Sequence, residues 1–204
     1  MSRVAIVDTG CCNLDSIARA IEECGGNPFV TDHPAGLERA ARIVLPGVGA
    51  FPEAMARLRS CGLDVALTEQ VMGRQIPFLG ICLGMQLVAT LGTEAGETAG
   101  LGWIDAQVRL LQAQPGERIP HIGWNEVLPV ADCPLFKGLT PGLDFYFVHS
   151  YALRPDRDED VAATTPYAGG FVSAVHRGNV FGVQFHPEKS QKAGFTVLRN
   201  FLAL

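Results

Sequence analysis

Several features common in other protein classes are missing from this sequence. It has no run of basic residues, no internal repeat, and no uninterrupted apolar stretch near the roughly 20 residues that a membrane helix needs. The formal net charge is −5 at pH 7. We therefore expect no nucleic-acid partner and no membrane association.

Cysteine is also sparse, with six residues in a chain of 204, and the five histidines are scattered. This number is too low for a disulfide scaffold, and no Cys-x-x-Cys pair indicates zinc. Adjacent cysteines such as Cys11 and Cys12 seldom form a relaxed disulfide, so we expect two separate thiols there. We expect no metal and no cofactor. The apolar run Val4–Val7 begins almost at once, which predicts that no signal peptide is present and that the protein is cytoplasmic.

The residues that are present favour one compact domain spanning 1–204, since 48% are hydrophobic and 18% charged. Short apolar runs alternate with helical patterns in the first half. We predict strands at 4–7, around 29–30, at 42–45 and at 76–79, and helices at 14–21, 53–59, 63–72 and 85–89. Asn13 is a plausible N-cap of the first helix. This alternation predicts a mostly parallel central sheet flanked by helices.

The second half has a different pattern. Strand-like segments separated by proline, glycine and aspartate turns cover 103–111, 121–130, 145–153, 161–165, 170–176 and 180–185. Some of these strands must pair antiparallel, in a mixed sheet or in an extra small one. A last helix is expected at 192–201. The fold class is therefore α/β, with antiparallel strands added in the C-terminal half.

The most reactive feature is Cys82, which lies between Gly80 and Gly84 where a predicted strand becomes a helix. Such glycines allow a tight turn that pushes a nucleophilic side chain out of the sheet. A helix N-terminus favours the thiolate and offers N–H groups to an oxyanion. Cys82 taken alone could equally be a buried structural cysteine.

A matching base is found in His186-Pro187-Glu188, just past the predicted strand 180–183. Strand ends on one edge of an α/β sheet usually form its functional site. Glu188 is close enough along the chain to accept a hydrogen bond from the His186 imidazole. Cys82, His186 and Glu188 together predict a catalytic thiol, imidazole and carboxylate.

These two segments resemble the class I (triad) glutamine amidotransferases, through Gly80-x-Cys82-x-Gly84-x-Gln86 and His186-Pro187-Glu188. Further blocks resemble, within that class, the glutaminase subunits of imidazole glycerol phosphate synthases. These blocks are 46–51, 120–125, 147–151 and 185–190, and the resemblance covers essentially the whole chain. Where that family usually has Met-Gly, this chain has Cys11-Cys12.

The resemblance implies that Cys82 attacks the side-chain amide of glutamine, while His186, oriented by Glu188, moves the proton. Water then releases glutamate from a thioester. The oxyanion would be held by the N–H groups of Leu83 and Val48. Because Val48 lies between Gly47 and Gly49, its peptide can flip, so the second donor could be absent until a signal arrives.

The resemblance also implies how substrate and partner are held. Gln86, one helical turn after Cys82, would contact the substrate. Two further segments would also contact it, one containing Gly47 and Gly49, the other containing His149, Ser150 and Tyr151. Trp124, Asn125 and Lys189 are expected near a partner. That partner would be a separate cyclase subunit, a (β/α)8 barrel, in a heterodimer that uses the ammonia in histidine biosynthesis.

Other interpretations of the sequence remain open at this point. The chain could be a glutaminase subunit for anthranilate, aminodeoxychorismate or pyridoxal phosphate synthesis, although blocks 120–125 and 147–151 argue against this. It could be a non-catalytic protein that braces a partner, which the intact Cys82, His186 and Glu188 make less favourable. A cysteine peptidase or γ-glutamyl hydrolase fits the three reactive residues alone, but Gln86 disfavours it.

Overall fold

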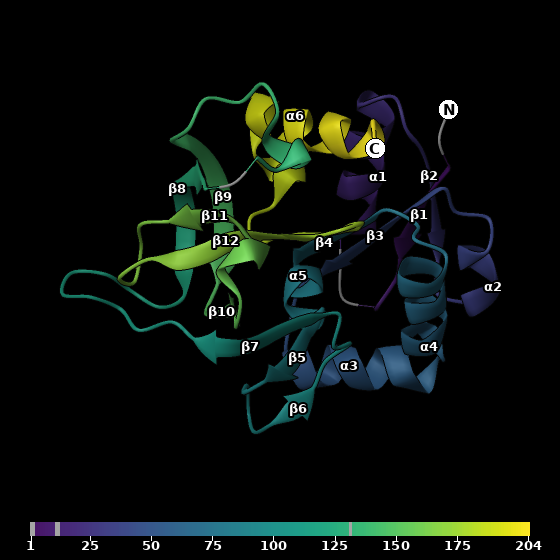
Figure 1. The fold of residues 1–204 in the computed structure, drawn as a ribbon, viewed down its shortest axis with the longest axis horizontal. Coiled ribbons are helices and arrows are strands. Elements are labelled where there is room, and N and C mark those ends of the chain that lie inside the picture. Colours follow the sequence, from purple (N-terminus) through teal and green to yellow (C-terminus); the bar gives the residue numbers. More distant parts are fainter. Residues whose placement is uncertain (1–2, 11–12, 131) are drawn as a thin grey trace.

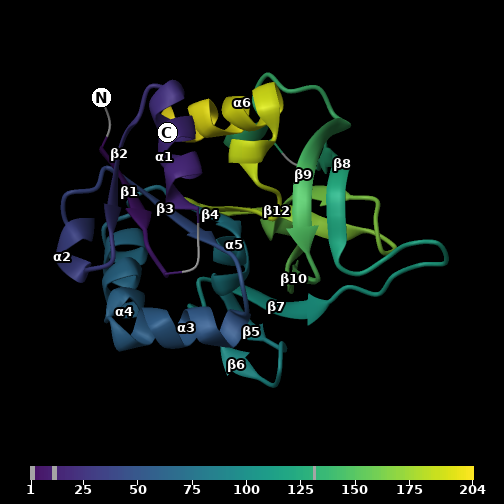
Figure 2. The same cartoon turned by 180° about the vertical axis from the view of Figure 1, so that it is seen from behind.

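A nine-stranded mixed sheet organises the molecule, with strands in the order β2-β1-β3-β4-β13-β12-β11-β8-β9. This computed structural model describes residues 3–10, 13–130 and 132–204, and Figures 1 and 2 show it from opposite sides. The expectation for Cys11 and Cys12 lies outside the described residues. The strands of this sheet are β1 (Arg3–Val7), β2 (Asn27–Thr31), β3 (Arg42–Gly47), β4 (Phe78–Cys82), β8 (His121–Pro129), β9 (Leu143–His149), β11 (Val161–Thr165), β12 (Phe171–Arg177) and β13 (Val180–Val183).

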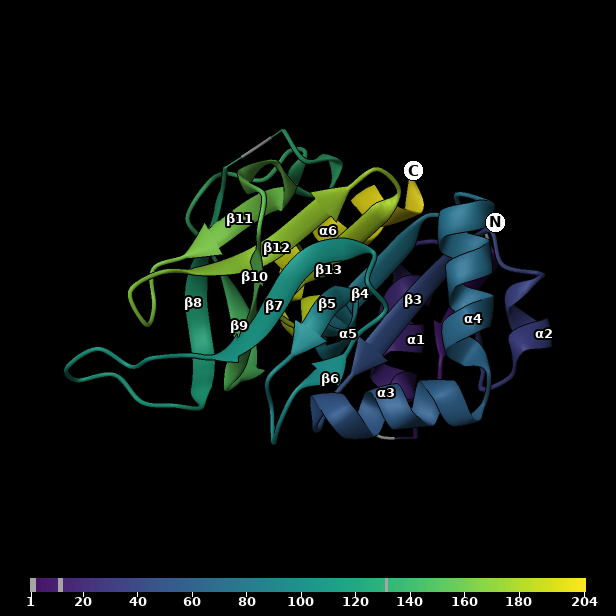
Figure 3. The ribbon, with the colours of Figure 1, turned by 60° about the horizontal axis from the view of Figure 1, so that its bottom comes forward.

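The sheet has a parallel half and an antiparallel half. Strands β2, β1, β3, β4 and β13 pair in parallel, whereas β12, β11, β8 and β9 continue the sheet in antiparallel pairs. A second sheet of four strands, β10-β7-β5-β6, lies beside it (Figure 3). Its strands are β5 (Ala89–Gly92), β6 (Thr98–Ala99), β7 (Ile104–Leu110) and β10 (Tyr151–Pro155). The predicted single α/β domain with added antiparallel strands is confirmed.

Helices cover both faces of the large sheet, and the alternation of side chains along β1 explains why. Val4 and Ile6 belong to the apolar cluster that includes α1 (Leu14–Glu23) and α6 (Gln191–Leu202). Ala5 and Val7 belong to the cluster on the other face. The helices on that second side are α3 (Phe51–Ser60), α4 (Leu63–Thr68) and α5 (Leu83–Leu87), with α2 (Pro34–Leu37) near the edge. A strand that is buried on both faces has a continuous apolar sequence, and residues 4–7 have such a sequence.

Local predictions are confirmed at several element ends. The Asn13 side chain caps α1 by accepting a hydrogen bond from the Ser16 N–H at 3.3 Å. The predicted helix at 63–72 begins as α4 and continues as a π-helix over Glu69–Gly73.

The 3-10 helices span Pro134–Phe136, Asp158–Asp160 and Pro187–Lys189. All four cysteines among the described residues are free thiols.

Two predicted elements were wrong, and in both cases tertiary pairing overrides the local pattern. The helix expected over 85–89 ends at Leu87, and β5 begins at Ala89. The reason is that N–H groups of residues 101–104 donate hydrogen bonds to the carbonyls of Leu87 and Val88. The Leu87 oxygen accepts from Leu101 N–H at 2.8 Å, and the Val88 oxygen accepts from Trp103 N–H at 3.0 Å. The single strand expected over 145–153 divides at Ser150 into β9, paired with β8, and β10, paired with β7.

The turn after β4 depends on two glycines that allow very close backbone contacts. A Cβ on Gly84 would lie 1.7 Å from the Leu45 carbonyl oxygen, and one on Gly80 would lie 2.5 Å from the Gly84 oxygen. No side chain fits either space, so α5 packs directly against the end of β3. This contact sets where β4 ends and how α5 leaves it.

Replacing Gly84 with alanine should therefore force the turn apart. We expect Gly84→Ala to lower the free energy of unfolding by roughly 3 kcal/mol or more, because backbone rather than a flexible side chain must move. Urea denaturation followed by circular dichroism measures the change. Gly73→Ala is the matched control, since its added Cβ meets nothing within 4 Å. Equal stability of the two variants would contradict this packing argument.

Candidate active site

Cys82 occupies the sharp turn between β4 and α5 in a conformation that L-residues rarely adopt. Its φ is 55° and its ψ is −109°, and the residue is only 6% exposed. A positive φ in a non-glycine residue stores strain that the surrounding packing must maintain. Here the close approach of Gly84 to β3 maintains it. The predicted tight turn from strand to helix at Cys82 is present.

His186 lies on the neighbouring strand end, as the sequence predicted. Strands β13 and β4 pair in parallel with Val183 opposite Ile81, so the chain segments that follow them leave the same edge of the sheet. The His186 backbone is fixed from two sides, because its N–H donates to the Tyr146 oxygen at 2.9 Å and its carbonyl accepts from the Ser190 hydroxyl at 2.6 Å.

Glu188 orients the imidazole of His186. The distance from His186 Nδ1 to Glu188 Oε1 is 2.8 Å, and both side chains are almost completely buried, with exposures of 5% and 4%. The carboxylate can only accept, so Nδ1 carries the hydrogen and Nε2 faces away from Glu188. Nε2 has no hydrogen-bond partner among the described residues and is therefore free to exchange a proton with a reacting group.

The protonation of His186 reflects opposing effects. Burial lowers the pKa of its imidazole, but interactions with Cys82 and Glu188 outweigh burial and raise the pKa to about 9. At neutral pH the imidazole is thus mostly an imidazolium, paired with negative charge in a largely buried site. A neighbouring imidazolium favours the thiolate, which is the nucleophilic form of cysteine, and the imidazolium can give its proton to a leaving group.

The sulfur of Cys82 contacts two other groups. The thiol donates to the Val148 carbonyl at 3.8 Å, and the Gln184 side-chain amide donates to the sulfur at 3.6 Å. Sequence reasoning did not select Gln184. Gln184 lies two residues before His186, just past the end of β13 at Val183.

A cavity of about 250 Å³ opens onto Cys82. Its volume suits a small molecule of about the size of an amino acid. The cavity brings together eight of the residues predicted for catalysis, oxyanion stabilisation or substrate binding. Its lining consists of Val48, Gly49, Cys82, Leu83, Gln86, Glu94, Val148, His149, Ser150 and Tyr151. Gly47 is buried behind the wall, where a Cβ would lie 2.8 Å from Leu83 Cβ.

Glu94 is a lining residue that sequence reasoning missed. Its Oε2 accepts the Phe51 N–H at the start of α3 at 2.7 Å, which holds the carboxylate beside the cavity. Residues 85–89 were predicted to be helical, so β5, the strand that ends two residues before Glu94, was not anticipated. Among the residues lining this cavity, Glu94 is the acidic one.

Gln86 and His149 meet at one backbone oxygen on the cavity wall. The carbonyl of Tyr151 accepts from Gln86 Nε2 at 2.9 Å and from His149 Nδ1 at 2.9 Å. His149 Nε2 in turn faces His121 Nδ1 at 3.0 Å. Burial lowers the pKa of His149 to about 3, with the neighbouring His121 and His186 lowering it as well, and the Tyr151 hydrogen bond raises it only in part. His149 is therefore neutral and is not a base at neutral pH.

Two of the three residues predicted to face a partner, Trp124 and Lys189, lie against Tyr146. Trp124 is 47% exposed, and its ring meets the Tyr146 ring edge-on at a centroid distance of 6.0 Å. The exposed Lys189 places its ammonium 5.8 Å from the same ring. Asn125 is partly buried beneath this surface, and its side chain contacts His121 at 3.3 Å. Tyr146 was not predicted.

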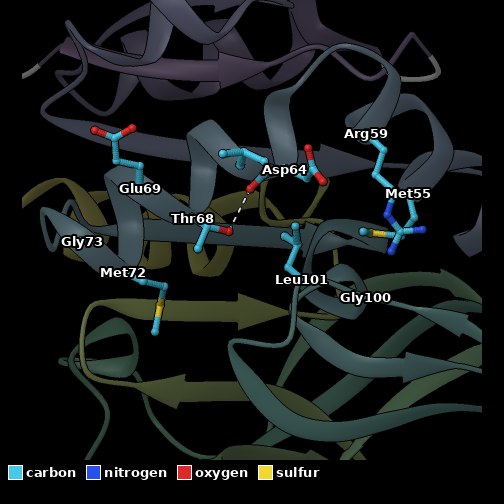
Figure 4. A pocket seen from close by; sticks show the side chains of 10 residues that line it. Met55, Arg59, Asp64, Thr68, Glu69, Met72, Gly73, Gly100 and Leu101 are labelled. Atoms are coloured by element: carbon cyan, nitrogen blue, oxygen red, sulfur yellow. Dashed lines mark hydrogen bonds between the residues drawn. The ribbon is translucent and has the colours of Figure 1, made fainter.

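A separate cavity of about 660 Å³ lies between α3, α4 and the loop before Trp103 (Figure 4). Its polar groups serve the protein's own structure. The Thr68 hydroxyl donates to the Asp64 carbonyl at 2.8 Å, and Arg59 donates to the Ala99 carbonyl at 2.7 Å. Its lining includes no cysteine or histidine. None of the residues predicted for catalysis lines this cavity.

Neither a metal cluster nor a membrane-spanning helix is found in the part of the chain that the structure describes. No group of three or more histidine, cysteine, aspartate or glutamate side chains is arranged there to hold a metal ion. No helix in the same residues is long and apolar enough to cross a bilayer.

Comparisons with known proteins agree with this geometry. The family model described as glutamine amidotransferase class-I matches residues 5–204. The imidazole glycerol phosphate synthase subunit HisH of Moorella thermoacetica is 46% identical over 201 residues, covering 98% of this chain and 94% of that protein. The protein of the same name from Caulobacter vibrioides is 45% identical, covering 99% of this chain and 98% of that protein.

Solved structures share the fold at low identity. A glutamine amidotransferase from Thermotoga maritima has a TM-score of 0.65 at 24% identity, covering 94% of this chain and 78% of its own. PurLQS from Thermotoga maritima has a TM-score of 0.76 at 20% identity, covering all of this chain and 99% of that chain. At these identities the likeness is one of fold alone.

Replacing Glu188 with glutamine should lower the pKa of His186 from about 9, because the imidazolium loses its anionic partner. In the wild type the folded-state pKa exceeds the ordinary value of 6.5, so protonation of His186 stabilises the fold fully below that value. This stabilisation disappears as the pH rises through 9. The free energy of unfolding, measured in urea across this range, should fall less in Glu188→Gln than in the wild type.

The exposed Glu22→Gln is the control and should keep the wild-type pH dependence. An unchanged pH dependence in Glu188→Gln would show that Glu188 does not hold the charge of His186.

Proposed function

Because the chain belongs to the class-I glutamine amidotransferase family, we propose that it is the glutaminase subunit of an imidazole glycerol phosphate synthase. In this function it hydrolyses glutamine to glutamate and ammonia. A separate cyclase subunit uses the ammonia to form imidazole glycerol phosphate and an aminoimidazole carboxamide ribonucleotide in histidine biosynthesis. The near-complete mutual coverage of two relatives of that name supports this assignment.

One observation carries the chemistry. Cys82, held at the elbow, lies between an imidazole oriented by a carboxylate and a cavity of about 250 Å³. The thiolate of Cys82 attacks the side-chain amide carbon of glutamine and forms a carbon–sulfur bond. His186 Nε2 gives its proton to the nitrogen, the carbon–nitrogen bond breaks, and ammonia leaves a thioester. His186 then takes a proton from water, which attacks the thioester and releases glutamate.

The developing oxyanion needs N–H donors close to Cys82. We assign them to Leu83, the first residue of α5, and to Val48, which lines the same cavity. Gly47 is packed tightly against Leu83, whereas Gly49 has a φ of +102° and open space around it. The Val48 N–H belongs to the peptide between Gly47 and Val48, so a rotation that aims it at the oxyanion changes ψ of Gly47 and φ of Val48.

Glutamine itself is held by the remaining cavity wall. Gln86 and the backbone of Gly49, His149, Ser150 and Tyr151 supply neutral donors and acceptors for the amino-acid end of the substrate. Glu94 supplies a negative charge, which suits the substrate ammonium group. Gly47 supports this wall from behind.

The surface around Tyr146 is the proposed cyclase interface in a heterodimer. Trp124 offers an exposed aromatic ring and Lys189 a cation that follows the reactive segment directly in sequence. Asn125 links this surface to His121 and so to the cavity wall. Aromatic residues such as Trp124 are typical of interface centres, and polar residues such as Lys189 suit the solvent-accessible rim.

We place the protein in the cytoplasm. The proposed reaction requires Cys82 as a free thiol, and the four described cysteines are all free. A reducing compartment maintains thiols in this state.

Replacing Glu94 with glutamine should raise the KM for glutamine by about tenfold and change kcat much less, because the lost charge binds the substrate ammonium group before and during the reaction. The amide keeps an acceptor for the Phe51 N–H, so the start of α3 stays in place. Steady-state glutamate release measures both constants. The exposed Glu97→Gln is the control, and an unchanged KM in Glu94→Gln would remove this role.

Activity should depend on the partner. We expect slow glutamate release by the chain alone, and faster release when the cyclase and its nucleotide ligand are added, because the second oxyanion donor must be brought into place. Cys82→Ala should abolish release under all of these conditions. No stimulation by the cyclase would contradict the assignment to histidine biosynthesis, while the glutaminase chemistry would stand.

A further inference from the structure

Gln184 is a fully buried amide that connects the nucleophile to the substrate wall. Its exposed fraction is 0%. Its Nε2 lies 3.6 Å from Cys82 Sγ, and its Oε1 lies 3.0 Å from Gln86 Nε2. Its backbone N–H donates to the Ser173 oxygen at 2.9 Å, which fixes the residue on the sheet. Burying an amide is unfavourable unless its polar groups form hydrogen bonds. For the Gln184 side chain, Cys82 and Gln86 provide them.

The neighbouring groups fix which end of the Gln184 amide faces Cys82. The Tyr151 carbonyl can only accept, so the Gln86 atom 2.9 Å from it is the NH2 group. That NH2 group has a second hydrogen, which points to Gln184 at 3.0 Å. The atom of Gln184 that receives it must be the oxygen. Its own NH2 group is therefore the one directed at the sulfur.

This orientation favours the thiolate over the thiol. In the thiol, the Cys82 hydrogen is directed to the Val148 carbonyl at 3.8 Å. Once the hydrogen is lost, the sulfur only accepts, and the Val148 oxygen no longer attracts it. The Gln184 N–H then provides a hydrogen bond to the sulfur in addition to the interaction with His186, and hydrogen bonds to a charged form stabilise that form.

We propose that Gln184 is a positioning residue that stabilises the Cys82 thiolate and couples it to the substrate-binding Gln86. This role rests on the proposed glutaminase function and goes beyond the three residues of the triad. Gln184 does not line the cavity, so it acts through Cys82 and Gln86 rather than on glutamine directly.

The test is alkylation of Cys82 by iodoacetamide, followed by mass spectrometry of the peptide that contains it, from about pH 5 to about pH 9. Gln184→Met keeps a similar shape without the donor. We expect alkylation at pH 7 to slow by about tenfold and its pH midpoint to rise. In glutamine hydrolysis, kcat should fall with a smaller change in KM.

Gln184→Glu provides a second variant, because its carboxylate keeps an acceptor for Gln86 but places negative charge beside the sulfur. It should slow alkylation at least as much as Gln184→Met. Gln70→Met is the matched control, since Gln70 is also buried and lies in the π-helix away from this cavity. It should alkylate at the wild-type rate.

Wild-type alkylation rates and pH midpoints in both Gln184 variants would overturn the proposal. Alkylation requires neither glutamine nor the cyclase. A wild-type protein that hydrolyses no glutamine would therefore contradict the proposed function, while the alkylation comparison would still decide the role of Gln184.

Discussion

The close backbone contact between Gly84 and Leu45 is the constraint on which the site depends. A Cβ at Gly84 would lie 1.7 Å from the Leu45 oxygen, so only glycine lets α5 begin where it does. This start holds Cys82 at a φ of 55°, in a conformation it would not adopt in a free chain. The same contact places Leu83 and Gln86 on the cavity wall, so sheet packing, nucleophile strain and substrate contacts have one common origin.

Two neighbouring histidines illustrate how environment assigns chemical roles. The pKa of His186 is raised to about 9 because Cys82 and Glu188 outweigh the effect of burial. The pKa of His149 is lowered to about 3, since burial dominates and its partners are a carbonyl and another histidine. One ring therefore carries a proton at neutral pH and the other remains neutral, so proton transfer is confined to the ring beside Cys82.

The sequence predicted what depends on local pattern. The Cys82 turn, the His186–Glu188 pair and the Asn13 cap follow from nearby residues, and the structure has all three. The strand β5 and the break at Ser150 depend on pairing with distant segments, and no local pattern distinguishes them from a longer helix or a longer strand. Glu94 was missed for that reason. Gln184 was missed because a buried amide gains its meaning only from the groups around it.

In the proposed reaction, the strained Cys82 becomes acylated by the γ-glutamyl group. Acid quenching during glutamine turnover in the presence of the cyclase, followed by peptide mass mapping, tests it most directly. We predict a glutamyl thioester on the peptide that contains Cys82, removed by hydroxylamine. Steady glutamate release with no acyl group on that peptide, or with one on a different residue, would contradict it.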